Sequence, residues 1–113
     1  MRKSKKDKKV KKVFNATTEK MKELITNEND LKIFMYYFNA EHNQFSERVA
    51  GIMASVSLGL LAKKTEERKL LMALAKKQIN EILPEMKEAA KPPASLVVLT
   101  NLFELNELLV DYL

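Results

Sequence analysis

The chain holds only two glycines and three prolines among its 113 residues. Sheet proteins need many turns, and turns depend heavily on these two residue types. Their scarcity therefore predicts long helices and no sheet. A chain of this length is expected to form one domain, with enough surface buried for an independent core. We predict an all-α fold, a single compact bundle of four to five mostly antiparallel helices joined by short loops.

Apolar residues recur at three- and four-residue spacing in five segments, which is typical of amphipathic helices. The first predicted helix follows a basic tail and ends near residue 26. The others cover residues 31–41, 47–64, 65 to about 83, and 96–113.

Helix ends are predicted from capping residues and prolines. Asn29 or Asp30 is expected to cap the second helix and Ser46 the third, although these two helices would also fuse through Asn43. Pro84 is expected to end or kink the fourth helix. Ser95 is expected to cap the last one.

Two helices carry the main core predictions. The second is apolar around most of its circumference, so we expect it to be buried on several sides. The fourth has a predicted core stripe made of Leu70, Leu71, Leu74, Ala75, Ile79, Ile82, Leu83 and Met86.

Residues 1–12 carry eight positive charges against Asp7 alone, so this segment has a charge of +7 and the rest of the chain −2. Like charges this dense repel one another. We therefore expect a disordered basic arm over residues 1–9 and the bundle domain over residues 10–113. Because residues 1–12 offer almost no apolar side chain, their removal is expected to leave the fold intact.

Lysine-rich segments neutralise phosphates, which predicts sequence-independent contact with DNA or RNA. The body is expected to add no second basic surface, because Glu66 and Glu67 interrupt its lysines. The predicted nucleic-acid-binding residues are Arg2, Lys3, Lys5, Lys6, Lys8, Lys9, Lys11 and Lys12.

Small residues recur on the third predicted helix within a narrow stripe, at Gly51, Ser55, Gly59 and Ala62. Small side chains at this spacing allow two helices to approach closely. The stripe is interpreted either as tight packing inside the bundle or as the interface of a homodimer.

Two acidic pairs, Glu85 with Glu88 and Glu104 with Glu107, each read E-x-x-E. They are similar to the paired acidic motifs of the all-α nucleotide pyrophosphohydrolases related to MazG. The resemblance implies that these four glutamates hold magnesium ions on a nucleoside triphosphate. However, Glu104, Glu107 and Asp111 share a face away from the apolar side of the last helix. We therefore expect no metal and no catalytic residue.

The chain has no cysteine and one histidine, His42, so neither disulfides nor a multi-histidine metal site is expected. The longest mostly apolar run, residues 49–62, is shorter than the roughly 20 residues of a membrane span. A cytoplasmic protein without a membrane span and without a cofactor is expected.

Two classes of function remain open. The first is a non-enzymatic helical accessory or regulatory protein whose basic arm contacts nucleic acid. The alternative is a protein-binding module, such as an inhibitor, an immunity-type protein or an antitoxin-like bundle. The magnesium-dependent pyrophosphohydrolase is a remote third interpretation.

Overall fold

The computed structural model describes residues 5–38 and 45–113, and all regular secondary structure in these ranges is helical. This confirms the predicted all-α bundle. The helices are α1 (Lys5–Thr26), α2 (Glu28–Tyr37), α3 (Phe45–Leu61), α4 (Thr65–Ala89), α5 (Pro93–Leu109) and the short 3₁₀ helix η2 (Val110–Tyr112).

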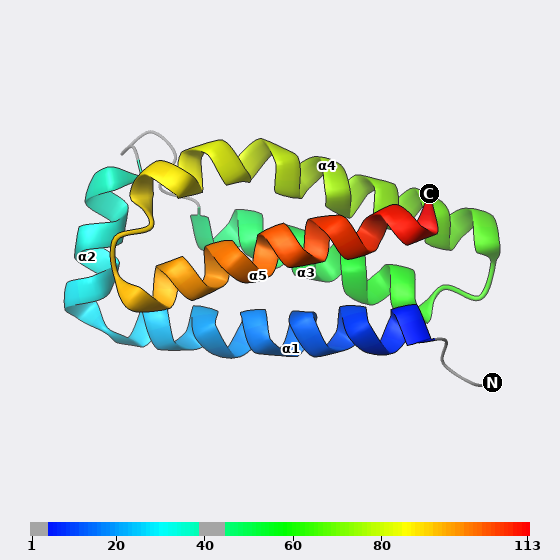
Figure 1. The fold of residues 1–113 in the computed structure, drawn as a ribbon, viewed down its shortest axis with the longest axis horizontal. Helices are drawn as coiled ribbons and strands as arrows, with labels where there is room; N and C mark the ends of the chain where they lie inside the picture. The colour runs from blue at the N-terminus through cyan, green and yellow to red at the C-terminus, as the bar shows by residue number, and fades with distance from the viewer. Residues whose placement is uncertain (1–4, 39–44) are drawn as a thin grey trace.

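Four long helices, α1, α3, α4 and α5, lie along one axis, and neighbours run antiparallel (Figure 1). Helix α1 packs mainly on α5 and α3 mainly on α4, while α4 and α5 join the two pairs. Short α2 crosses one end of the bundle. The start of α1, the α3–α4 connection and the end of α5 lie together at the other end (Figure 1).

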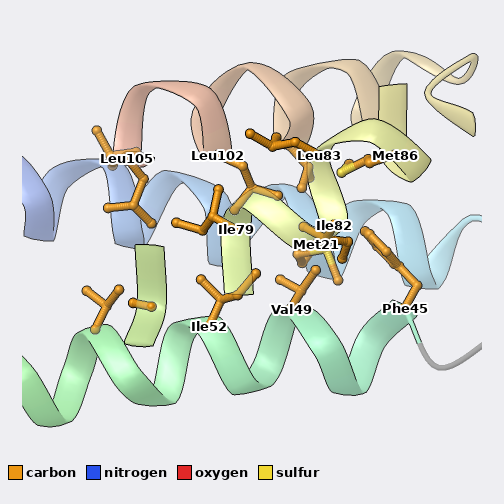
Figure 2. Packing of buried hydrophobic residues seen from close by; sticks show 14 of the residues in the cluster. Met21, Phe45, Val49, Ile52, Ile79, Ile82, Leu83, Met86, Leu102 and Leu105 are labelled. Atoms are coloured by element: carbon orange, nitrogen blue, oxygen red, sulfur yellow. The ribbon is translucent and has the colours of Figure 1, made fainter. Parts of the chain in front are cut away.

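The core lies between the four long helices. Figure 2 shows Val49 and Ile52 of α3 facing Ile79 and Ile82 of α4, with Leu102 of α5 beside them. These side chains are at most 1% exposed. Each such burial contributes about 1.5–3 kcal/mol, so this seam supplies the main drive for folding.

Helix α2 packs against the end of the bundle along one face and exposes the other. Its N-cap is Asn27, whose side chain accepts a hydrogen bond from the Asp30 backbone N–H at 3.1 Å. Phe34 is buried and lies against Phe45, with ring centroids 4.5 Å apart. Tyr36, however, is 81% exposed. The prediction of a helix buried on several sides is therefore wrong, because α2 crosses the bundle end and only one face meets it.

Several helix boundaries differ from the predictions. Helix α2 is capped by Asn27 and not by the residues expected, and Ser46 lies inside α3. Helix α1 begins at Lys5, inside the segment expected to be a flexible arm. Helix α5 begins at Pro93, since a proline at the first helical position loses no hydrogen bond there. Ser95 is therefore no cap, and its buried hydroxyl donates to the Pro92 carbonyl at 2.6 Å. The predicted end of the second helix and its possible fusion through Asn43 fall outside the described residues.

Helix α4 continues through Pro84 to Ala89, although Pro84 was expected to stop or kink it. Proline removes the bond to the carbonyl four residues earlier, that of Asn80. Both Asn80 and Pro84 are exposed, so water reaches the carbonyl that proline leaves without its helical partner. Meanwhile Leu83 and Met86 bury the opposite face and hold the last turns in place.

The first turns of α4 face the core differently from the prediction. Leu70 is 72% exposed and Leu74 is 46% exposed, whereas Met72 is fully buried. Met72 does not belong to the predicted core stripe. In the structure Met72 faces the core because it fills the space above Gly59.

The small-residue stripe of α3 lies against α4. The Ser55 hydroxyl is 2.9 Å from Oε1 of Gln78, and a Cβ on Gly51 would contact the Gln78 side chain at 3.5 Å. A Cβ on Gly59 would lie 2.9 Å from Sδ of Met72. Ala62 follows α3 and is half-buried. The stripe thus packs against α4 within the chain.

One segment within the described residues, Pro93–Tyr112, is long and apolar enough to cross a membrane by length and composition. Sequence reasoning did not single it out. Its mean hydropathy is 1.3, and 33% of it is buried in the bundle. Its buried residues, such as Val98, Leu102 and Leu105, pack in the core between α1 and α4.

The two glycines of α3 are expected to respond oppositely to added side chains. Gly51→Ala should stabilise the fold by about 0.5–1 kcal/mol, because alanine favours helix and meets only an ordinary contact. Gly59→Leu should cost about 1–3 kcal/mol, because Met72 already fills the space. Urea unfolding followed by circular dichroism measures both, and equal effects at the two sites would contradict the packing described here.

Candidate nucleic-acid interface

A buried carboxylate joins the helices at the end of the bundle where α1 begins. Asp7 is 6% exposed. Its Oδ1 accepts a hydrogen bond from the Tyr112 hydroxyl at 2.5 Å, and its Oδ2 lies 3.2 Å from Nη1 of Arg68. We call Asp7, Arg68 and Tyr112 the Asp7 cluster. It connects α1, α4 and η2, which are far apart in the sequence.

Arg68 extends the cluster to α3. Its Nε donates to the Gly59 carbonyl at 3.0 Å and its Nη2 to the Leu60 carbonyl at 2.8 Å. The last carbonyls of a helix have no partner within it, and arginine is well suited to satisfy them. A single guanidinium thus closes the end of α3 and neutralises Asp7.

The Asp7 cluster explains why the helix extends into the basic segment. Aspartate in the first turn is favoured by the helix dipole, and this one also gains two partners on other elements. Val10, one turn later, is fully buried. The segment of residues 1–12 therefore supplies both a core residue and the Asp7 carboxylate, whereas its removal was expected to cost almost no buried surface.

The environment of Tyr112 changes its acidity. Burial raises the pKa of its phenol well above the ordinary value, and the hydrogen bond to Asp7 and the Asp7 charge raise it further. The Lys6 ammonium lies 4.5 Å from the centre of the Tyr112 ring, and it also donates to the Asp111 carbonyl at 3.3 Å. Lys6 therefore has a packing role in addition to its charge.

The remaining lysines of the first turns of α1 point into solvent. Exposed side chains are found at each of these five positions: Lys5, Lys8, Lys9, Lys11 and Lys12. None of them belongs to an ion pair within residues 5–38 and 45–113. Arg2 and Lys3, also predicted to bind nucleic acid, lie outside the described residues.

The next turns of α1 are different. Lys20 pairs with Glu23 at 2.9 Å and Lys22 with Glu19 at 3.6 Å. Among the described residues, the lysines of α1 that form no ion pair therefore all lie in its first two turns.

Three further lysines lie at the same end of the bundle. Lys63 and Lys64 stand in the α3–α4 connection and Lys69 in the first turns of α4, and all three are exposed. The contact between Arg68 and Asp7 holds this region against the start of α1. Glu66, Glu67 and Asp111 are exposed in the same region, so the charges that the body adds here are balanced in number. The expectation that the body adds no second basic surface stays a prediction.

We call the eight exposed lysines at this end the basic end: Lys5, Lys8, Lys9, Lys11, Lys12, Lys63, Lys64 and Lys69. The carboxylates in the same region are Glu66, Glu67 and Asp111, with Asp7 buried beneath. Positive charge therefore exceeds negative charge on this surface. Helix α1 presents five of the lysines, and three of these, Lys5, Lys8 and Lys9, fall within residues 1–9, where a flexible arm was predicted.

The acidic pairs do not assemble into a metal site in the described part of the chain. Glu85 lies 2.6 Å from Nη1 of Arg48, and Glu88, Glu104 and Glu107 are exposed. No group of three or more acidic or histidine side chains within residues 5–38 and 45–113 is placed to hold a metal ion. His42 lies outside these ranges.

Comparison with protein-family models, with curated proteins and with solved structures found no match.

The Tyr112 phenol should contribute to stability in a pH-dependent way. Tyr112→Phe removes the hydrogen bond to Asp7 and should cost about 1–2 kcal/mol at pH 7. Because folding raises the pKa of this phenol, its contribution is complete below about pH 10 and is lost as the pH rises further. The wild type should therefore lose its advantage over Tyr112→Phe in strong base. Urea unfolding of both proteins between pH 7 and about 11 tests this, and a constant difference would contradict it.

Proposed function

We propose that this protein is a small non-enzymatic accessory protein, working in the cytoplasm, that contacts nucleic-acid phosphates through the basic end. The observation that carries the proposal is the set of five exposed lysines on two turns of α1 without carboxylate partners among the described residues. Lysines from the α3–α4 connection and α4 add to the same surface.

The energetics of this surface favour an anionic partner. Lys5, Lys8, Lys9 and Lys12 are three or four residues apart, so neighbouring ammonium groups repel within the helix. Each such pair costs about 0.2–0.5 kcal/mol, and cations near a helix N-terminus also oppose the dipole. Phosphates would relieve both penalties and release counterions.

The chemistry of these residues indicates binding without sequence preference. A lysine ammonium is a point charge and lacks the planar fork by which arginine reads guanine. Arg68, the one arginine of this region among the residues that the structure describes, is engaged with Asp7 and two carbonyls. Phosphate contacts position a protein on nucleic acid but do not specify a base sequence.

We predict dissociation constants of about 10⁻⁴–10⁻⁶ M at physiological salt for duplex DNA and for single-stranded RNA. Fluorescence anisotropy at several salt concentrations measures them. The double variant Lys8→Gln, Lys12→Gln should weaken binding to all sequences alike. It should also reduce the slope of log affinity against log salt by about 2, because two phosphate contacts are lost.

The matched control is Lys32→Gln with Lys87→Gln, which removes the same charge from exposed positions on α2 and near the end of α4. It should bind nearly as well as the wild type, since long-range attraction is screened over about 8 Å. If both double variants lose equal affinity, net charge and not the basic end is responsible. Tight, salt-insensitive binding to one sequence would contradict the proposal.

A protein-binding module is the second candidate, and a groove between α1 and α3 favours it. The groove has a volume of about 370 Å³. Its walls are mostly apolar and include Phe14, Met21, Ile25, Val49 and Met53. A stable complex with a protein, unaffected by Lys8→Gln with Lys12→Gln, would favour this alternative.

A further inference from the structure

The outer face of α4 carries a stripe of five exposed residues, which we call the α4 stripe: Glu67, Leu70, Leu74, Lys77 and Glu81. They are alternately three and four residues apart, the spacing that places side chains along one side of a helix. This side differs from the one that buries Met72, Ala75 and Ile79.

The α4 stripe leaves apolar surface in contact with water. Leu70 is 72% exposed and Leu74 46% exposed. On α3, the helix that packs most closely along α4, Leu58 is 56% exposed and Leu61 74%. Four leucines exposed to this degree on two adjacent helices are typical of an interaction surface.

The charge order indicates which partner fits. From Glu67 to Lys77 the stripe reads negative, apolar, apolar, positive. In the opposite direction the order is positive, apolar, apolar, negative. The stripe is therefore complementary to its own reverse.

We infer that the α4 stripe is the interface of a homodimer in which two α4 helices pair antiparallel about a two-fold axis. A two-fold interface must match a surface to itself, and this stripe meets that condition in one direction only. Leu70 then faces the partner's Leu74, and Glu67 faces the partner's Lys77. A parallel pairing in register would place every charge opposite its like.

The two-fold axis crosses α4 at the level of Met72, midway between Leu70 and Leu74 along the helix. This places the two basic ends on opposite sides of the axis, so the dimer would offer two phosphate-binding surfaces to one nucleic acid. The dimer does not depend on nucleic-acid binding, because the stripe and the lysines of α1 are separate surfaces.

Sedimentation across a concentration series tests the dimer, which should have a micromolar dissociation constant given its small apolar area. Glu67→Lys and Lys77→Glu each turn two attractive contacts into repulsive ones and should each weaken association about 10-fold. The double variant Glu67→Lys, Lys77→Glu restores opposite charges and should recover wild-type association. Phe103→Glu, at an exposed apolar residue of α5, is the control and should associate as the wild type does.

Cysteine cross-linking tests the register, because the chain has no native cysteine. Glu67→Cys with Lys77→Cys should give a covalent dimer on mild oxidation, since each cysteine faces its counterpart on the other copy. Each single variant should cross-link poorly, because two copies of the same position lie about 15 Å apart along the helix axis.

Three results would overturn the inference. The first is a wild-type chain that stays monomeric up to about 500 µM, far above the expected range. The second is efficient cross-linking of either single cysteine variant, which would indicate parallel helices. The third is a charge-swapped double variant that associates no better than the single variants. Circular dichroism of each variant confirms that the monomer remains folded.

Discussion

The carboxylate of Asp7 is the contact on which the end of the bundle depends. It is buried, and it is held by an arginine from α4 and a tyrosine from η2. The same arginine closes the end of α3. Breaking such an ion pair on one side leaves a buried charge without compensation, which costs several kcal/mol. Through this contact, three helices and the end of the chain share one polar centre.

This arrangement also decides how the basic segment is presented. Without the Asp7 cluster, the lysines of residues 5–12 would repel one another and favour an extended tail. With it, the first turns of α1 are folded, and five lysines point outward in fixed positions beside those of the α3–α4 connection. Fixed charges lose less conformational entropy on binding than a flexible tail does. The fold thus provides a preorganised basic surface.

Several features could be predicted from the sequence because local chemistry determines them. The end of α1 at Thr26 and the core face of α5 at Leu102, Leu105 and Leu109 follow from periodicity. The features that were missed depend on distant partners. In the sequence Asp7 is a single carboxylate among lysines, and only the fold brings Arg68 and Tyr112 into contact with it.

The same limit applies to burial and to the candidate site. Met72 faces the core where Leu70 does not, because Gly59 on the adjacent helix leaves room for it. The lysines of α1 were predicted from the sequence alone. The lysines of the α3–α4 connection could not be placed beside them from the sequence. Their proximity to α1 results from the packing of helices about 60 residues apart in the chain.

The central claim is that the basic segment is a folded part of the bundle, fixed by Asp7. Amide hydrogen exchange of Lys9 to Lys12, resolved by NMR, tests it most directly, because these amides donate within α1 only if the helix begins near Lys5. The account predicts clear protection of these amides in the wild type and its loss in Asp7→Ala, while amides at the centre of α4 stay protected in both proteins. Exchange of Lys9 to Lys12 in the wild type at the rate of an unstructured peptide would contradict it.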